Sequence, residues 1–224
     1  YKNFKNKQEI NKLKKIKLEK KEEARGITKE KKELNMAFHY DRPPYMFGKT
    51  SSKGIEVDLV KEIFALQGYK VNIHQMSKTT MEKLLQTNPK FDAVASVTNS
   101  DDGSFYSDKY SLYEDFAITR KADNIKINSM EELGKYDFVS WKNAYNDLGE
   151  KFHHYFNPKD GIYKSKYHDR NSQKEQHKLF FENKIKVIVV DKFIFKWYKL
   201  DFNKKDEYTF HKILPLASNS GVKF

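Results

Sequence analysis

The stretch GIEVDLVKEIFALQGYKVNIH (54–74) decides the fold class of this chain. Its first half has apolar residues at the spacing of one helix face, namely Leu59, Val60, Ile63 and Phe64. Gly68 is placed to end that helix, and KVNIH (70–74) then alternates as a strand. This stretch therefore predicts a helix that leads directly into a strand.

Two strand-like runs flank this unit. LNMAF (34–38) precedes it and leads into the turn-rich DRPPY (41–45), while FDAVASV (91–97) follows it as a candidate for a buried strand. Between the strands at 70–74 and 91–97, Thr79 and Glu82 have the form of a capping box that opens a helix. The alternation of strands and helices predicts an α/β unit with a largely parallel sheet.

A second unit of the same kind follows. Its predicted elements are, in chain order, a strand YDFVSW (136–141), a helix over 143–156, a strand IKVIVV (185–190) and a helix over 193–200. Capping-box patterns occur at Ser129 with Glu132 and at Ser172 with Glu175. In open α/β sheets ligands bind outside the carboxyl ends of strands. A site between two such units would be formed by the 41–45 turn, the 96–100 loop, the 141–145 turn and Asp191.

Composition and charge limit the classes of function. The 224 residues are 38% hydrophobic and include 17 Phe and 14 Tyr, which is enough for real cores, and no run of 18 apolar residues occurs. Cysteine is absent, which excludes disulfides and thiolate metal sites from this chain. Of the net charge of +12, residues 1–33 carry +7 through 13 Lys and Arg against 6 Glu. The rest is only mildly basic, so we expect no nucleic-acid partner.

Residues 1–33 form a charge-rich segment that favours helix. Its clustered apolar residues are Ile10, Leu13, Ile16 and Leu18, which form a thin stripe. We expect either a solvated linker or juxtamembrane helix, or a helix that docks on another subunit or an anionic surface. Because the chain starts at Tyr1, any targeting or anchoring element is expected outside it.

Eight segments in order resemble the type 2 periplasmic solute-binding family, in its polar-amino-acid branch (extracellular solute-binding protein family 3). They are PPYMF (43–47), GIEVDLVKEIFALQGYKV (54–71), FDAVAS (91–96), YSDKY (106–110), DFAITRK (115–121), SMEELGKYDFVSW (129–141), NAYNDLGEKF (143–152) and NKIKVIVVDKFIFKWY (183–198). The resemblance covers about residues 34–224. It implies a two-lobed α/β fold whose lobes are joined by two crossovers and close on a solute.

The resemblance also implies domain boundaries. A basic helical extension spans 1–33, lobe 1 spans 34–118, lobe 2 spans 119–209, and 210–224 returns to lobe 1 as an apparently incomplete closing segment. DFAITRK (115–121) resembles the first crossover, and the stretch from Phe210 to Leu216 resembles the return.

The ligand contacts implied by the resemblance are retained only in part. An Arg that clamps a ligand carboxylate is expected in the loop 96–110, which contains none. Arg42 is the candidate that would supply this charge from another direction, or it is paired structurally. Asp191 resembles the Asp that pairs with a ligand ammonium, and it would equally cap the following helix. Ser96 and Thr98 resemble ligand-bonding hydroxyls or ordinary loop caps.

The remaining predicted site residues are aromatic or lie near a helix start. Tyr45, with Phe47, resembles turn positions where an aromatic ring lines the pocket, the alternative being core packing. Trp141, Asn143 and Tyr145 lie where the second lobe offers a strand end and a helix N-terminus, which suits an anion. Trp141 and Tyr145 would equally serve as packing.

Motifs for catalysis are missing from the sequence. It has no G-x-S-x-G, no H-E-x-x-H and no glycine-rich phosphate loop, so we expect neither an enzyme nor a cofactor. His153 and His154 are adjacent, which on a helix turns their side chains about 100° apart, so no metal site is expected.

Three functions fit these observations. The first is an extracytoplasmic domain that captures a small polar, amine-bearing ligand in an interlobe cleft for transport. The second is the sensory ectodomain of a membrane receptor. The third is a ligand-free structural component of a larger cell-envelope assembly. Residues 1–33 are the segment expected to contact a membrane protein or envelope complex, with membrane attachment through a segment outside this chain.

Overall fold

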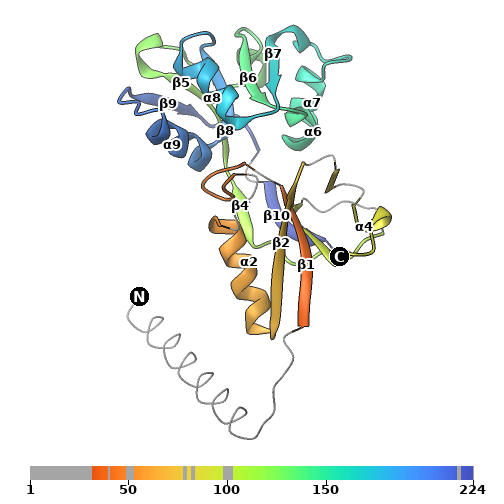
Figure 1. The fold of residues 1–224 in the computed structure, drawn as a ribbon. Helices are drawn as coiled ribbons and strands as arrows, with labels where there is room; N and C mark the ends of the chain where they lie inside the picture. Colours follow the sequence, from red (N-terminus) through yellow and green to blue (C-terminus); the bar gives the residue numbers. More distant parts are fainter. Residues whose placement is uncertain are drawn as a thin grey trace, which may run out of the picture.

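Two five-stranded sheets form the cores of two lobes that are stacked end to end (Figure 1). The computed structural model describes residues 32–39, 41–48, 53–77, 80–81, 84–97, 103–215 and 218–223. Lobe 1 is the lower lobe of Figure 1 and lobe 2 the upper one. The predicted two-lobed α/β fold is confirmed, whereas the predicted charged helix at the N-terminus lies outside the described residues.

Lobe 1 is built on a mixed sheet with the strand order β2-β1-β3-β10-β4. The strands are β1 (Lys32–His39), β2 (Tyr69–Met76), β3 (Ala93–Val97), β4 (Ser111–Tyr113) and β10 (Ser218–Lys223). β1 pairs in parallel with both β2 and β3, as the strand–helix–strand order predicts. β10 closes the lobe by pairing antiparallel to β3 and β4.

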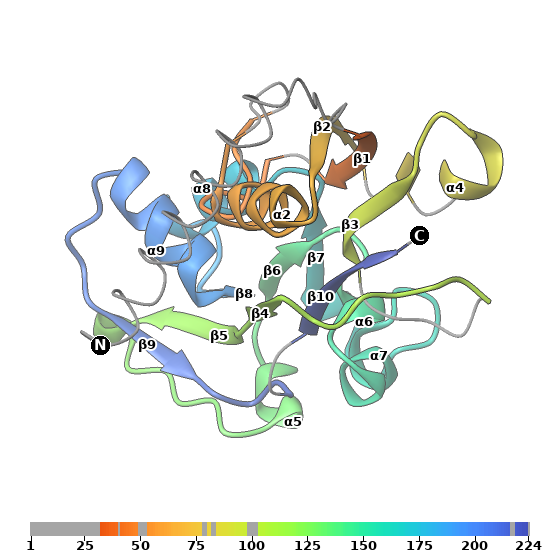
Figure 2. The same ribbon diagram turned by 90° about the horizontal axis from the view of Figure 1, so that it is seen from below.

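Helices cover both faces of the lobe 1 sheet (Figure 2). α2 (Ile55–Leu66) packs Val57 and Val60 against Met36 and Phe38 of β1. α4 (Leu84–Thr87) lies on the other face, where Met81 and Leu84 contact the alternate residues of the strands. Because successive side chains of a strand point to opposite faces, the strands contribute to two cores, one on each face of the lobe 1 sheet. The proposed capping pair Thr79 and Glu82 lies outside the described residues.

Lobe 2 contains the second sheet, in the order β7-β6-β8-β5-β9. The strands are β5 (Asp115–Arg120), β6 (Phe138–Trp141), β7 (Tyr167–Arg170), β8 (Val187–Asp191) and β9 (Tyr208–His211). The helices are α5 (Met130–Leu133), α6 (Ala144–Asp147), α7 (Glu150–Phe156), α8 (Gln173–Phe181) and α9 (Lys192–Asp201), with two 3₁₀ turns at Lys121–Asp123 and Lys164–Lys166. The all-buried β8 pairs with β6 in parallel and with β5 antiparallel.

Local sequence signals explain where the helices of lobe 2 begin. Ser129 accepts a hydrogen bond from the Glu132 amide at 3.2 Å, and Ser172 accepts one from the Glu175 amide at 3.4 Å, so both predicted N-caps are confirmed. The prediction of a single helix over 143–156 is wrong, because the structure has two helices there. The stretch is divided into α6 and α7 because Gly149 has φ 88°, a conformation that leaves the helical region.

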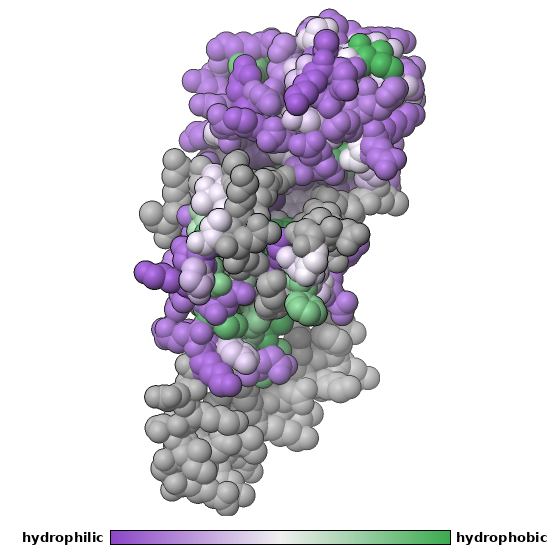
Figure 3. Space-filling model, turned by 90° about the vertical axis from the view of Figure 1, so that its right-hand side faces the viewer, coloured by the Kyte–Doolittle hydropathy of each residue, from purple (hydrophilic) through white to green (hydrophobic). Residues whose placement is uncertain are grey.

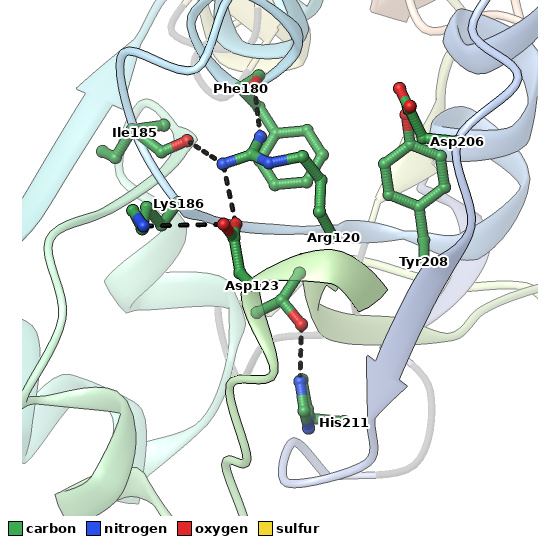
Figure 4. Close-up of polar contacts among 9 residues, drawn as sticks. Arg120, Asp123, Phe180, Ile185, Lys186, Asp206, Tyr208 and His211 are labelled. Carbon is green, nitrogen blue, oxygen red and sulfur yellow. Dashed lines mark hydrogen bonds and ion pairs between the residues drawn. The ribbon is translucent and has the colours of Figure 1, made fainter.

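The DFAITRK segment is strand β5 inside lobe 2, where Arg120 fixes it in place (Figure 4). The Arg120 guanidinium donates to the carbonyl of Phe180 at 2.7 Å and lies 4.8 Å from the ring of that residue. It also lies 3.0 Å from the Asp123 carboxylate. Arg120 is therefore a structural residue that ties β5 to α8.

Glu114 separates β4 of the first sheet from β5 of the second, and the return to the first sheet comes between β9 and β10. The expected lobe boundaries at 118 and 209 remain predictions. His211 ends β9 just before the return, and its imidazole bonds the Thr119 hydroxyl at 3.0 Å, also visible in Figure 4. None of the helices within the described residues has the length and apolarity needed to cross a bilayer.

The two lobes differ in surface character. Figure 3, which views the molecule from the right-hand side of Figure 1, shows a largely hydrophilic surface on lobe 2 and hydrophobic residues gathered on lobe 1. Five phenylalanines of lobe 2 are fully buried in its interior: Phe138, Phe152 and Phe156 pack on one face of the sheet, and Phe180 and Phe195 pack on the other.

Candidate functional site

A turn of lobe 1, residues 41–48, reaches toward lobe 2. The Arg42 amide donates to the carbonyl of Met46 at 2.9 Å, and the Glu56 amide donates to the carbonyl of Tyr45 at 3.1 Å. Gly54 allows this contact, because a Cβ there would lie 2.2 Å from the Tyr45 carbonyl oxygen, and its φ is 138°. The turn is therefore seated on the first turn of α2.

Arg42 and Glu56 form the polar centre of lobe 1 at this end. The Arg42 guanidinium lies 3.5 Å from the Glu56 carboxylate and 5.2 Å from the centre of the Tyr113 ring. Glu56 is fully buried, and its Oε2 accepts hydrogen bonds from Ser96 and Tyr113. Burial acts to lower the pKa of Arg42, whereas Tyr113 and Glu56 act to raise it. The net pKa lies above the ordinary value, so the guanidinium stays charged.

Several polar atoms of this centre have no hydrogen-bond partner among the described residues. They are Nε and one terminal nitrogen of Arg42 and Oε1 of Glu56. Buried donors without partners cost about 1–3 kcal/mol each, so such groups normally find a partner. The terminal nitrogen of Arg42 keeps its ion pair with Glu56, whereas Nε has neither a hydrogen bond nor an ion pair among the described residues, which makes Arg42 a candidate to hold an anionic group.

Ser96 is used within lobe 1. Its backbone is left-handed, with φ 62°, its amide donates to the Tyr110 hydroxyl at 3.1 Å, and its own hydroxyl donates to Glu56 at 2.5 Å. The hydroxyl thus bonds a side chain of α2 and no loop backbone, and its predicted ligand role stays a prediction. Thr98 lies outside the described residues.

Asp191 lies at the carboxyl end of β8 and caps α9. Its Oδ1 accepts from the amides of Phe193 and Ile194 at 2.8 and 3.1 Å, and its Oδ2 accepts from the amide of Glu114 at 2.9 Å. Burial raises the pKa of Asp191 in spite of these hydrogen bonds. The N-cap interpretation is therefore confirmed, while a ligand role stays a prediction.

Tyr45 joins the two lobes. Its hydroxyl donates to Asp191 Oδ1 at 3.1 Å, and only 4% of the residue is exposed. Next to it, the ring of Phe47 lies 4.9 Å from that of Trp197 on α9. The aromatic turn of lobe 1 therefore rests on the first turns of α9.

We expect Tyr45→Phe to weaken this contact by about 1.5 kcal/mol, because a hydrogen bond to a buried charged group is lost while Asp191 keeps its backbone donors. Urea unfolding of the full chain measures the loss. Tyr69→Phe, on β2 and away from the junction, is the control. Equal losses of unfolding free energy in Tyr45→Phe and Tyr69→Phe would contradict a stabilising hydrogen bond between Tyr45 and Asp191.

Trp141, Asn143 and Tyr145 are placed differently from one another. The Trp141 indole donates to Asp147 at 2.9 Å. Asn143 precedes α6 with φ 61° and forms no side-chain cap, and α6 has only four residues, which weakens the predicted anion site. Tyr145 packs beside His153 and lines a separate surface cavity of about 490 Å³ on lobe 2.

Sequence analysis missed Asp115, the first residue of β5. It pairs with Asp191 across the sheet and is 7% exposed. Burial, followed by the charges of Asp191 and Asp147, raises the pKa of Asp115 to about 8, although Arg42 acts in the opposite direction. In the described part of the chain its carboxyl accepts no hydrogen bond. The only sequence signal was an acid at the start of an otherwise apolar strand.

The junction of the lobes therefore gathers acids around one base. Arg42, Tyr45, Ser96 and Asp191 come together there, joined by the unpredicted Glu56, Asp115 and Asp147. Asn143 and Tyr145 are not part of this cluster. The described residues contain no group of three or more side chains suited to hold a metal ion.

Comparison with known proteins agrees with this architecture. Residues 34–214 match the model of the bacterial extracellular solute-binding proteins, family 3. A comparison with curated proteins found no match.

Solved structures with bound amino acids share the fold. The arginine-bound form of truncated ArgBP from T. maritima is 18% identical with a TM-score of 0.60, and 85% of this chain and 87% of that one are covered. An ABC uptake transporter substrate binding protein from Streptococcus pneumoniae with bound histidine is 15% identical with a TM-score of 0.64, covering 84% and 78%. The GluR0 ligand-binding core from Nostoc punctiforme with L-glutamate is 15% identical with a TM-score of 0.61, covering 85% and 84%.

These three structures hold arginine, histidine and L-glutamate. The family match extends over most of the chain, and the two-sheet fold agrees with it. This chain belongs to the bacterial extracellular solute-binding proteins, family 3.

Proposed function

We propose that this protein captures a small, amine-bearing polar solute at the junction of its two lobes. The observation that carries the proposal is the excess of acids there. Within the described residues Glu56, Asp115 and Asp147 lie near enough to Arg42 to interact with its charge, and Asp191 lies beside Asp115. Opposite charges at about 4 Å attract by about 4 kcal/mol at an effective dielectric constant of 20. A cation entering this site would therefore offset repulsion that the solute-free protein bears.

Asp115 would be the principal amine partner. Its carboxyl is buried without a hydrogen bond among the described residues, whereas Asp191 already accepts from Tyr45 and three backbone amides. The predicted ammonium site at Asp191 would then include Asp115, which is paired with Asp191 on the adjacent strand.

Arg42 would hold the other end of a zwitterionic solute. Its Nε has no hydrogen-bond partner among the described residues, and its terminal nitrogen Nη2 has only the 3.5 Å ion pair with Glu56, so the two nitrogens would suit the two oxygens of a carboxylate. The loop 96–110 contains no Arg that would compete for this role. The solved structures hold arginine, histidine and L-glutamate, which share an ammonium and a carboxylate, and this supports a zwitterionic solute.

The capture would serve transport or sensing outside the cytoplasm. Two similar proteins are ABC transporter substrate-binding proteins from Streptococcus pneumoniae, which supports delivery to a membrane transporter. The basic residues 1–33 would suit attachment to a membrane protein or envelope complex, as in a sensory ectodomain.

A solute-free structural role is the second candidate. It is favoured by one observation, the hydrogen bonds that already occupy Asp191, including the one from Tyr45 across the lobes. In that case the junction would be a permanent contact.

A thermal-shift panel of L-arginine, L-lysine, L-histidine, putrescine and L-glutamate separates the two candidates. A solute at 100 times its Kd should stabilise the protein by about 2.7 kcal/mol, or roughly 5–10 °C in Tm. We expect a basic member of the panel to give this shift, and Asp115→Asn to abolish it.

Asp201→Asn, at the exposed end of α9, is the matched control and should keep the shift. If no member of the panel moves Tm, the solute-free structural role is favoured. If Asp115→Asn responds like the unsubstituted protein, the assignment of the amine site is wrong.

A further inference from the structure

The outer face of α2 carries an apolar stripe. Its large side chains are exposed to an unusual extent: Ile55 57%, Leu59 38%, Ile63 41% and Leu66 63%. They recur at intervals of four, four and three residues, so they lie on one face of the helix along its whole length.

This stripe is not part of the lobe 1 core. The opposite face of α2 already packs Val57 and Val60 on the sheet, together with the half-buried Phe64. A helix with two apolar faces is typical of one that is covered on both sides, and contiguous exposed apolar surface marks a docking site.

The charges beside the stripe point to a basic partner. Asp58 and Glu62 are exposed on α2 next to the apolar positions. Residues 1–31, which lie outside the described residues, hold 12 Lys and Arg against 5 Glu and contain the apolar positions Ile10, Leu13, Ile16 and Leu18. This segment offers both the apolar side chains and the opposite charge.

We propose that residues 10–18 of the same chain dock as a helix on the apolar stripe of α2. The occupant is a segment of this chain, held by burial of aliphatic side chains and by lysines facing Asp58 and Glu62.

The connection along the chain permits this docking. Lys32, where β1 begins, is paired with Tyr69, and Tyr69 follows the end of α2 at Leu66 by three residues. Figure 1 shows the start of β1 and the end of α2 at the same end of lobe 1. Residues 19–31, including Gly26, are sufficient to link the two, because α2 is only about 18 Å long.

Cross-linking of the full chain tests the proposal, since the absence of cysteine allows single pairs to be introduced. The test pair is Leu13→Cys with Leu59→Cys. The control pair is Leu13→Cys with Leu200→Cys, the latter at a position on α9 in lobe 2 that is 78% exposed. A short bis-maleimide is applied at low protein concentration, and the products are separated by size and mapped by mass spectrometry.

We expect cross-linked monomer from the test pair at least ten times faster than from the control pair. Adding Ile55→Asp, an acid in the first turn of α2 that spares the core, should reduce that rate several-fold. Cross-linked dimer whose yield rises with protein concentration would overturn the proposal in favour of a second copy. Equal rates for the two pairs, or no effect of Ile55→Asp, would also overturn it.

Discussion

Asp115→Asn is expected to stabilise the solute-free protein by up to about 4 kcal/mol at pH 7. The Asp115 carboxyl is buried beside Asp191 and Asp147, and its pKa is raised to about 8 from an ordinary value of 3.8. At pH 7 the unfolded chain has released this proton, and the folded protein must bind it again, which lowers the free energy of unfolding. An uncharged amide of nearly the same shape removes this cost.

The pH dependence gives the sign of this effect. Because the folded pKa is raised, the contribution of Asp115 to stability is complete below pH 3.8 and is lost as the pH rises toward about 8. The loss amounts to about 1.4 kcal/mol per pH unit in this window. Urea unfolding at several pH values should show a shallower decline between pH 6.5 and 8 in Asp115→Asn than in the unsubstituted protein.

Asp201→Asn on the surface of lobe 2 is the control and should leave the pH profile unchanged. If Asp115→Asn is less stable than the unsubstituted protein at pH 7, the carboxyl is a stabilising partner and not a source of repulsion. A variant that gains stability and loses solute binding would show that the acid is kept for function.

His177→Phe is expected to protect the protein against acid. His177 is fully buried in α8, its Nδ1 lies 2.7 Å from the carbonyl oxygen of Gln173, and its ring stacks on Tyr198 at 4.3 Å. Burial lowers the pKa of His177 to about 3. Stability from the neutral ring is therefore present above pH 6.5 and is lost as the pH falls toward 3.

Protonation of His177 is expected to reduce the free energy of unfolding by about 3 kcal/mol at pH 4. The substitution by Phe should abolish this loss and preserve the aromatic packing. Urea unfolding at pH 7 and pH 4 measures it. His154→Gln, at an exposed position of α7, is the control and should retain the loss. An equal drop in stability between pH 7 and pH 4 in His177→Phe and in the unsubstituted protein would contradict this account.

The secondary structure could be predicted well because local signals and burial agree. The apolar run 185–190 overlaps β8, which spans Val187–Asp191, and the hydroxyls of Ser129 and Ser172 cap α5 and α8 as expected. The prediction of one helix over 143–156 was wrong because the apolar pattern continues across Gly149, whose positive φ ends the helical conformation. The pattern Leu59, Val60, Ile63 and Phe64 identified α2, yet Leu59 and Ile63 face outward, since periodicity does not distinguish two apolar faces.

The predicted residues that meet at the lobe junction, Arg42, Tyr45, Ser96 and Asp191, lie at strand ends or in the turn before α2. Asp191 and Arg42 were found because strand ends and the turn before α2 are identifiable in the sequence. Asp115 and Glu56 were missed because each lies inside an apolar pattern, and only tertiary packing brings them together. Their significance follows from burial and mutual repulsion, which are properties of the folded chain.

The most direct test of solute capture at the lobe junction is the number of protons released on binding. Because the pKa of Asp115 is raised to about 8, the solute-free protein holds a proton there at pH 7, and a bound ammonium should lower that pKa and expel the proton. Calorimetric titration with L-arginine, or whichever basic solute shifts Tm, in two buffers of different ionisation enthalpy should give a release close to one proton, and none in Asp115→Asn. Binding without proton release, or the same release in Asp115→Asn, would contradict the account.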